Sequence, residues 1–301
     1  MKKKIAVVMG GVSTERDISL KSGEEVFKYL DRDKYDVCKF IIDEESDTFN
    51  KIPKDIDFAF IALHGKFGED GKIQSIFEAM KIPYSGCDPL TSGIFMDKNF
   101  TKKILKSSNL PTAPWTVVRS IDDIDYNLID EIGYPVFIKP NSGGSSVATF
   151  FVQNKEEVLN AVTEGLKVDS CVMIEKYIKG VEHTSFILDG EIYPTLVIKY
   201  DTVFFDRETK YSEEHGAIEE VIYLPEKLQE KVNQISSAIW KEFNCKGYVR
   251  IDLIINGDDV NVLEINTIPG MTTTSLIPKS AKAKGLSYPE LLDKIIESSI
   301  K

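Results

Sequence analysis

The segment from Gly247 to Asn266 reads Gly-Tyr-Val-Arg-Ile-Asp-Leu-Ile-Ile-Asn-Gly-Asp-Asp-Val-Asn-Val-Leu-Glu-Ile-Asn. Apolar and polar residues alternate on both sides of Asn-Gly-Asp-Asp, which predicts two antiparallel strands joined by a hairpin. Alternation places Arg250 and Asp252 on one face of the first strand, and Glu264 and Asn266 on one face of the second. If the two faces coincide, an arginine, two carboxylates and an amide converge. Such a group is typical of a site where Mg²⁺ binds together with nucleotide phosphates.

An alternative interpretation of this hairpin is a pair of amphipathic strands with a solvated polar face. Two apolar residues weaken it, because alternation predicts that Ile254 and Val262 lie on the same faces as the polar groups. The metal hypothesis also sets a condition on the hairpin. A plain two-residue turn would pair Asp252 with Asn261 and point Glu264 the wrong way. The hypothesis therefore predicts a β-bulge or a loop with an odd number of residues.

Two segments closer to the N-terminus are compatible with nucleotide contacts, although the second predicts no function by itself. The loop Lys139-Pro-Asn-Ser-Gly-Gly-Ser-Ser-Val147 leaves one predicted strand and enters another. Its glycines allow a close backbone approach to phosphate, and Lys139 supplies positive charge, although such loops are often simple connections. It does not match the P-loop pattern G-x-x-x-x-G-K-[ST]. The segment from Glu175 through Ile178 to Glu182 ends a strand with an acid, and its backbone could pair with an adenine.

The N-terminal third alternates between predicted strands and helices. We expect these elements in turn at Lys4–Met9, Ser19–Leu30, Val37–Ile42, Phe58–Leu63 and Lys72–Met80. This alternation predicts a parallel sheet covered by helices, with ligands at the carboxyl ends of the strands. Two glycine-rich polar segments follow such ends, at 10–15 and 64–71.

The rest of the chain predicts two further units, because 301 residues is long for a single core. The first has helices at Asp97–Ser107 and Lys155–Leu166 and strands at Thr116–Val118, Val136–Lys139, Ala148–Val152 and Val172–Tyr177. The second has strands at Thr184–Leu188, Tyr193–Ile198, Val249–Ile255 and Val260–Ile265, and helices at Pro225–Phe243, Leu276–Lys284 and Tyr288–Ser298.

Composition and charge argue against several classes of protein. The net charge of −11 argues against nucleic acid as a partner, because phosphate contacts need a basic surface. The four cysteines form no C-x-x-C pair and the three histidines show no metal-ligand spacing, so neither disulfides nor a zinc site are expected. No apolar run is long enough to cross a bilayer. We therefore expect a cytoplasmic protein without nucleic-acid or membrane partners.

Eight motifs, in order along the chain, resemble those of the D-alanine–D-alanine ligases. They are GGVSTER at 10–16, ALHG at 62–65, GEDG at 68–71, MDK at 96–98, KP at 139–140, GSSV at 144–147, GYVRID at 247–252 and EINTIPGM at 264–271. The resemblance implies an α/β N-terminal parallel-sheet domain that binds substrate (1–97). It is followed by an α+β, two-lobed ATP-grasp fold, with a central lobe (98–180) and a C-terminal lobe that holds the magnesium site (181–301).

In that family ATP lies between the sheets of the two lobes. The resemblance implies that ATP is bound by Lys98, Lys139, Ser145, Glu175, Lys176, Ile178, Glu182 and Lys210. It implies that two Mg²⁺ (or Mn²⁺) ions are bound by Asp252, Glu264 and Asn266.

The resemblance also implies the reaction. The carboxylate of a first D-alanine attacks the γ-phosphate, and the amine of a second D-alanine then attacks the resulting acyl phosphate. The implied substrate-binding residues are Glu15, His64, Arg250, Gly270, Ser275 and Leu276. The implied catalytic residues are Glu15, Ser145, Tyr211, Arg250 and Gly270. The resemblance implies a hydrogen-bond chain of Glu15, Ser145 and Tyr211 that closes loops over the acyl phosphate. It implies that Arg250 and the Gly270 N–H stabilise the oxyanion formed when the second amine attacks. A homodimer is a further implication.

Three residues depart from the family pattern: Ala148 where glycine is usual, Gly143 in place of a bulkier residue, and Arg207 where an aromatic is commoner. These three departures concern the rate at which the loops close over the substrates. The pair Lys210-Tyr211 favours D-alanine over D-lactate as second substrate, with D-serine as an alternative.

Three other functions are alternative interpretations of the sequence. One is a different ATP-grasp ligase. A Rossmann oxidoreductase is disfavoured because the third glycine of G-x-G-x-x-G is missing. A non-catalytic nucleotide sensor is disfavoured because Arg250, Asp252, Glu264 and Asn266 are all present.

Overall fold

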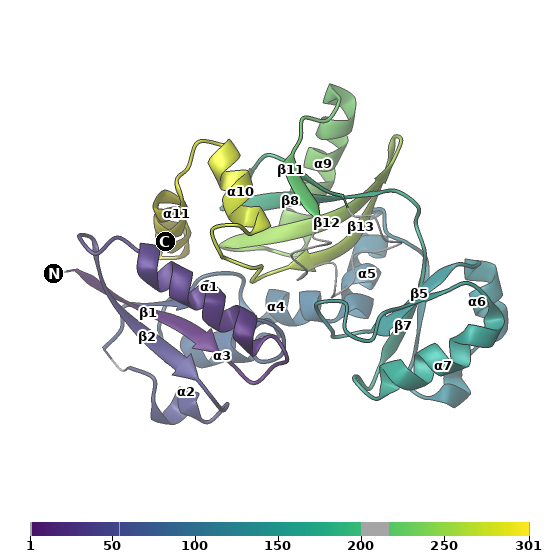
Figure 1. The fold of residues 1–301 in the computed structure, drawn as a ribbon, viewed down its shortest axis with the longest axis horizontal. Helices are drawn as coiled ribbons and strands as arrows, with labels where there is room; N and C mark the ends of the chain where they lie inside the picture. Colours follow the sequence, from purple (N-terminus) through teal and green to yellow (C-terminus); the bar gives the residue numbers. More distant parts are fainter. Residues whose placement is uncertain (1, 54, 200–216, 301) are drawn as a thin grey trace.

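The computed structural model describes residues 2–53, 55–199 and 217–300, which form three β-sheets with helices packed on them (Figure 1). The first sheet is parallel, with strand order β2-β1-β3, and the other two are antiparallel. This confirms the predicted fold class, in which a parallel sheet is followed by antiparallel ones.

The N-terminal sheet is covered by helices on both faces. Its elements are β1 (Lys3–Gly10), α1 (Arg16–Tyr29), β2 (Tyr35–Ile42), α2 (Asp47–Asn50), β3 (Phe58–Ile61) and α3 (Lys72–Ala79). Alternate residues of β1 face opposite ways, so that Met9 packs with Val26 of α1 and Val8 with Phe77 of α3. Helix α1 packs closely on β1 at Gly23, where an added Cβ would lie 2.5 Å from the Cβ of Met9.

The central sheet has the strand order β4-β7-β5-β6. Its elements are α5 (Lys98–Ser107), β4 (Trp115–Val118), η1 (Ile121–Asp123), α6 (Tyr126–Ile132), β5 (Val136–Pro140), β6 (Phe150–Val152), α7 (Lys155–Leu166) and β7 (Val172–Lys176). Helix α7 has the predicted bounds and buries Val158 and Val162 in the same core as Val136 and Ile174 of the sheet.

The C-terminal sheet has the order β11-β10-β8-β12-β13, with β9 paired to β8. Its elements are β8 (Val181–Leu188), β9 (Glu191–Ile192), β10 (Leu196–Lys199), β11 (Ile218–Val221), α9 (Glu226–Glu242), β12 (Tyr248–Asn256), β13 (Asp259–Asn266), α10 (Leu276–Ala283) and α11 (Tyr288–Ser299). Phe186 of β8 and Tyr248 of β12 belong to the same core as Val7 of β1. This shared core fixes the N-terminal sheet against the C-terminal sheet.

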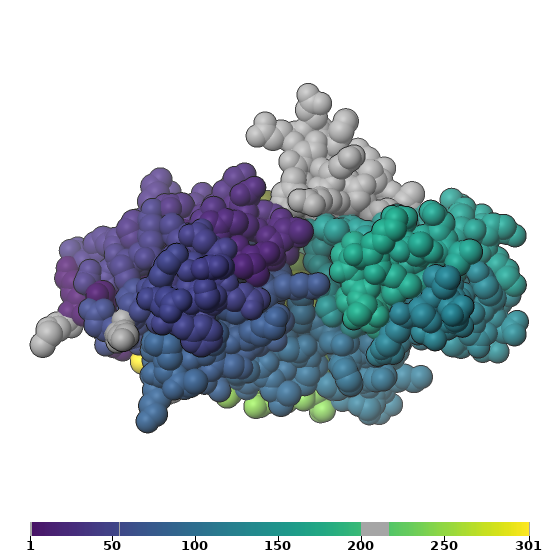
Figure 2. Space-filling view, turned by 90° about the horizontal axis from the view of Figure 1, so that it is seen from below, coloured from purple at the N-terminus to yellow at the C-terminus, as the bar shows by residue number. Residues whose placement is uncertain are grey.

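The N-terminal residues and the central sheet lie at opposite ends of the molecule, shown in purple and teal in Figure 2. Helix α4 (Pro89–Met96), which was not predicted, lies between them directly before α5. Among the described residues, no helix has both the length and the apolar composition that a membrane crossing requires.

Two strands begin later than predicted for local reasons, and β3 and β7 end earlier than predicted. Strand β6 begins at Phe150 and not at Ala148, because Ala148 has a φ of +51°, which lies outside the strand region. Strand β10 begins at Leu196 and not at Tyr193, and Pro194 in between has no N–H to donate to a ladder. The elements α2, η1, α6, β9 and β11 were also not predicted.

Candidate active site

The β12–β13 hairpin places its polar residues on one face. In the antiparallel register Arg250 lies opposite Asn266 and Asp252 lies opposite Glu264. Directly opposed residues share a face of the sheet. The arginine, the two carboxylates and the amide therefore converge, as the metal hypothesis required.

A β-bulge produces this register. The turn contains only Gly257 and Asp258, and the register shifts by one residue between Asp252 and Leu253, which leaves Leu263 unpaired. The expected position of Val262 was wrong, because the bulge reverses the alternation and Val262 lies opposite Leu253 in the hydrophobic core.

Asp252 is only 2 % exposed and accepts four hydrogen bonds. Nε and Nη2 of Arg250 donate to its two oxygens at 2.9 and 2.6 Å, and Nδ2 of Asn266 donates at 3.0 Å. The hydroxyl of Thr184, which lies opposite Asp252 on β8, is the fourth donor. Burial alone would lower the pKa of Arg250, but the carboxylate of Asp252 raises it, so the guanidinium stays charged. Thr184 was missed because only strand pairing brings it here.

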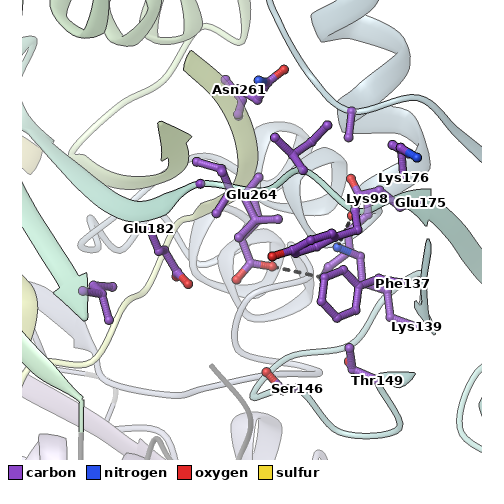
Figure 3. Close-up of a pocket in the computed structure, with 18 of the residues that line it drawn as sticks. Lys98, Phe137, Lys139, Ser146, Thr149, Glu175, Lys176, Glu182, Asn261 and Glu264 are labelled. Atoms are coloured by element: carbon purple, nitrogen blue, oxygen red, sulfur yellow. Dashed lines mark hydrogen bonds and ion pairs between the residues drawn. The ribbon is translucent and has the colours of Figure 1, made fainter. Parts of the chain in front are cut away.

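Lys98 stands at the start of α5, where the preceding Asp97 caps the helix by accepting from Phe100 N at 2.9 Å. Its ammonium donates to the Gly143 carbonyl at 2.6 Å and lies 3.6 Å from a carboxylate oxygen of Glu264 (Figure 3). One lysine thus joins the Gly/Ser loop of the central sheet to the hairpin of the C-terminal sheet.

Glu175, at the end of β7, is buried between two lysines. Lys139 Nζ donates to one carboxylate oxygen at 2.6 Å (Figure 3), and Lys102 Nζ lies 2.5 Å from the other. Burial would raise the pKa of Glu175, but the charges of Lys102 and Lys139 lower it to about 2. Lys102 was not predicted, although it shares the buried face of α5 with Leu105.

Glu15 and Ser145, far apart in sequence, are in contact: the Ser145 hydroxyl donates to the Glu15 carboxylate. Ser145, Ser146 and Ala148 have φ values of +51°, +55° and +51°, a left-handed conformation that favours glycine. Ala148 stands where the family usually has glycine, and its positive φ explains that preference, because glycine adopts this conformation with less strain. The predicted residues Arg207, Lys210 and Tyr211 lie outside the described residues.

His64 is 5 % exposed and is held through both ring nitrogens. Nδ1 lies 3.0 Å from the Ile268 carbonyl oxygen, which can only accept, so Nδ1 carries a hydrogen. Nε2 lies 3.1 Å from the Ser22 hydroxyl, which is also 3.5 Å from Met271 N. A carboxylate oxygen of Glu69 lies 3.6 Å from Nδ1, and burial raises the pKa of Glu69. Ser22 and Glu69 were not predicted to belong to the site.

Gly270 and Ser275 frame the loop that leads into α10. Ser275 precedes the helix, and its Oγ accepts from Thr272 N at 3.1 Å. A Cβ at Gly270 would lie 3.2 Å from that Oγ, so this loop has little room for a side chain. Leu276 opens α10 and is buried.

The backbone N–H of Lys176 is already engaged within the protein and cannot donate to an adenine. Its backbone N–H donates to the Pro114 carbonyl at 2.9 Å, and its ammonium donates to the carbonyls of Gly133 and Tyr134 at 2.8 and 3.2 Å. The backbone carbonyl of Lys176 is therefore the group of this residue that could contact an adenine. Ile178 and Glu182 line the same cavity as Glu175.

Two adjoining cavities contain these residues. One, of about 490 Å³, is lined by Lys139, Glu175, Ile178 and Leu263, among others (Figure 3). The other, of about 950 Å³, is lined by the residues expected to bind the amino acids: Glu15, His64, Arg250, Gly270, Ser275 and Leu276. Lys98, Ser145 and Glu264 line both cavities. The two cavities therefore adjoin at these residues.

Comparisons with known proteins agree with this geometry. The family model "D-ala D-ala ligase C-terminus" matches residues 104–297, and "D-ala D-ala ligase N-terminus" matches 4–53 and 44–87. D-alanine–D-alanine ligase of Clostridium botulinum (strain Loch Maree / Type A3) is 54% identical over 297 residues, covering 99% of this chain and 98% of that protein. D-alanine–D-alanine ligase B of Clostridium perfringens is 49% identical over 298 residues, with coverages of 99% and 98%.

Two solved structures also match nearly the whole chain. D-alanine–D-alanine ligase of Bacillus anthracis complexed with ATP has a TM-score of 0.90 and 43% identity, covering 99% of this chain and 97% of that one. The VanG D-Ala:D-Ser ligase of Enterococcus faecalis has a TM-score of 0.85 and 28% identity, with coverages of 99% and 100%.

Proposed function

The chain belongs to the D-alanine–D-alanine ligase family and is an ATP-dependent ligase, and we propose that it joins two D-alanines through a D-alanyl phosphate. The observation that carries this proposal is the convergence of Arg250, Asp252, Glu264 and Asn266 on one face beside Lys98. We assign residues 1–97 to substrate binding and residues 98–180 and 181–301 to the two ATP-grasp lobes. The dipeptide would serve as a precursor of peptidoglycan.

The hairpin offers ligands that suit magnesium or manganese. The groups that would bind a metal are the carboxylates of Asp252 and Glu264 and the amide oxygen of Asn266. These hard oxygen ligands are few, so phosphate oxygens would have to complete the coordination. Within the described parts of the chain, no three His, Cys, Asp or Glu side chains are grouped so that they could hold a metal ion, so the proposed site would depend on the amide of Asn266 and on phosphate oxygens as well. We propose that these residues hold two Mg²⁺ (or Mn²⁺) ions with ATP. The ions would neutralise charge on the phosphates.

In our proposal ATP occupies the cavity of Figure 3. Lys98 and Lys139 hold the phosphates, with Lys210 as a further cation. Glu175 and the backbone from Lys176 to Ile178 meet adenine, and Glu182 meets the ribose. Phosphoryl transfer depends on positioning and charge neutralisation more than on covalent help, which fits a cavity wall built from lysines.

The amino acids occupy the adjoining cavity. Glu15 binds the ammonium of the first D-alanine, with His64 close by, and Ser145 and Tyr211 hold Glu15 and the loops in place. The carboxylate oxygen of the first D-alanine attacks the γ-phosphorus and ADP leaves. Closing the loops excludes water, which protects the acyl phosphate from hydrolysis.

The amine of the second D-alanine then attacks the carbonyl carbon. Arg250 and the Gly270 N–H stabilise the oxyanion that forms, phosphate leaves, and the amine loses a proton. Ser275 and Leu276, at the positive end of α10, bind the second carboxylate. We propose D-alanine for this position because the relatives at 49–54% identity are D-alanine–D-alanine ligases, whereas the D-Ala:D-Ser ligase is 28% identical. On family resemblance we also propose a cytoplasmic location and a homodimer.

A steady-state assay tests the function. The purified protein is supplied with ATP, Mg²⁺ and D-alanine, D-serine or D-lactate, and both released phosphate and the condensed product are measured, the latter by mass spectrometry. We expect D-alanyl-D-alanine with stoichiometric phosphate. Phosphate release with another pair, but not with D-alanine alone, would show that the substrate assignment is wrong.

A further inference from the structure

Lys102 is a buried lysine one helical turn beyond Lys98 on α5. Its side chain is 3 % exposed. Nζ lies 2.5 Å from the Glu175 carboxylate, donates to Thr112 Oγ1 at 2.5 Å and donates to the Ala113 carbonyl at 3.1 Å. The Thr112 hydroxyl donates its own hydrogen to the Val262 carbonyl, so it can only accept from Lys102. Lys102 thus donates to two neutral acceptors, and the Glu175 carboxylate lies at ion-pair distance, where its charge opposes the burial that lowers the pKa of Lys102.

Lys102 acts through Glu175 and not on a ligand directly. Glu175 lines the nucleotide cavity, but Lys102 is absent from the walls of both cavities described above. Its ammonium lies 5.3 Å from the centre of the Trp115 ring, which together with its acceptors holds it in place. The position of its charge is therefore set by the protein core.

Both lysines lower the pKa of Glu175, but only Lys139 lines the nucleotide cavity. With Lys139 alone, the carboxylate would cancel the charge that Lys139 needs for phosphate. With Lys102 on the other oxygen, two cations share one anion, and one net positive charge faces the cavity. Lys102 also opposes the effect of burial, which would otherwise raise the pKa of Glu175 and favour its neutral form.

We propose that Lys102 is a positioning residue that keeps Glu175 an ionised hydrogen-bond acceptor, and thereby selects nucleotides whose base carries a 6-amino group. This inference rests on the proposed function, which places adenine beside Glu175. An ionised carboxylate can only accept, so it binds an amino group and repels a 6-oxo group. A protonated carboxyl could donate to a 6-oxo group, and the selection would weaken.

The test compares ATP with ITP, whose base has an oxo group in place of the 6-amino group. The ratio of kcat/KM for ATP to that for ITP is measured in the wild type, Lys102→Met and Lys106→Met. Lys106 is the matched control, because it lies on the same helix, 6.0 Å from the same Trp115 ring, but is exposed. We expect Lys102→Met to lower the ratio by about tenfold, the effect of losing one charged hydrogen bond, and more at pH 6 than at pH 8. Lys106→Met should keep the wild-type ratio.

A loss of activity that is equal for ATP and ITP in Lys102→Met would overturn the inference, because a merely structural lysine affects both nucleotides alike. Glu175→Gln serves as a second variant if Lys102→Met does not fold. Its carboxamide can accept or donate, so the ratio should fall here too, and an unchanged ratio would refute the proposal. The proposed function is tested separately, since it fails only if the wild type forms no D-alanyl-D-alanine from ATP and D-alanine.

Discussion

Replacing Ser22 with alanine tests whether α1 holds the loop that carries Gly270. Ser22 is fully buried, and its hydroxyl lies 3.1 Å from His64 Nε2 and 3.5 Å from Met271 N. His64 in turn binds the Ile268 carbonyl at 3.0 Å. The loop is thus held on both sides of Gly270, whose N–H we assign to the oxyanion.

The magnitude follows from these contacts. The substitution leaves His64 Nε2 buried without its partner, which costs about 1–3 kcal/mol of unfolding free energy. The contact with Met271 N is long and adds little. Complete loss of an oxyanion donor lowers kcat by roughly 10²–10³, so a loosened donor should lower it by about tenfold to a hundredfold. The KM for ATP should change little, because Ser22 lies away from the nucleotide cavity.

Ser19→Ala is the matched control. Ser19 is also fully buried on α1, and its hydroxyl accepts from Gly10 N at 2.9 Å and donates to the Ala62 carbonyl at 2.7 Å. Its loss should cost similar stability while kcat stays close to the wild-type value. Urea unfolding and steady-state kinetics measure both quantities. Equal falls of kcat in the two variants, or a destabilised Ser22→Ala with wild-type kcat, would refute the reasoning.

Three further predictions concern the metal face, the Gly/Ser loop and acid stability. Glu264→Gln should lower kcat by about a hundredfold or more, because the variant loses a charge that we assign to metal binding. The free energy of unfolding should change by less than about 0.5 kcal/mol. Full activity at saturating Mg²⁺ would contradict the assignment of Glu264 as a metal ligand. Ala148→Gly should not destabilise the protein, whereas Ala148→Val should lower the free energy of unfolding by more than about 1 kcal/mol, because a β-branched residue fits a φ of +51° poorly. If urea unfolding ranks the two variants the other way, residue 148 does not keep its left-handed conformation. The folded-state pKa of Glu175, about 2, lies below its ordinary value of 4.5, so its contribution to stability is complete above pH 4.5 and is lost as pH falls towards 2. Unfolding free energies measured between pH 5 and pH 2 should therefore fall less steeply in Glu175→Gln than in the wild type, and parallel curves would argue against the ion pairs with Lys102 and Lys139.

The sequence predicted most elements of the fold because their patterns are local. Alternation found β12 and β13, and helical spacing found α7 and α9. The need for a common metal face also predicted an irregularity in the hairpin, which is the bulge at Leu263. The motif resemblance pointed to residues that the structure brings together, such as Glu15 and Ser145.

What the sequence missed depends on contacts between distant elements. Lys102 stands next to Lys103 in a lysine-rich helix, and only packing against Trp115 and Glu175 distinguishes the buried lysine from the exposed one. Thr184 reaches Asp252 through strand pairing, and Ser22 reaches His64 through the packing of α1 on the sheet. No periodicity in the chain encodes these neighbours.

The bulge at Leu263 has a further consequence for the chemistry available to β13. In an uninterrupted strand, successive side chains project to opposite sides, so two adjacent residues cannot both serve one ligand. Here Leu263 and Glu264 both line the nucleotide cavity. The bulge thus places an apolar and an anionic residue from neighbouring positions of β13 at the wall of one cavity. Deleting Leu263 would keep Glu264 opposite Asp252 and remove the apolar part of that wall.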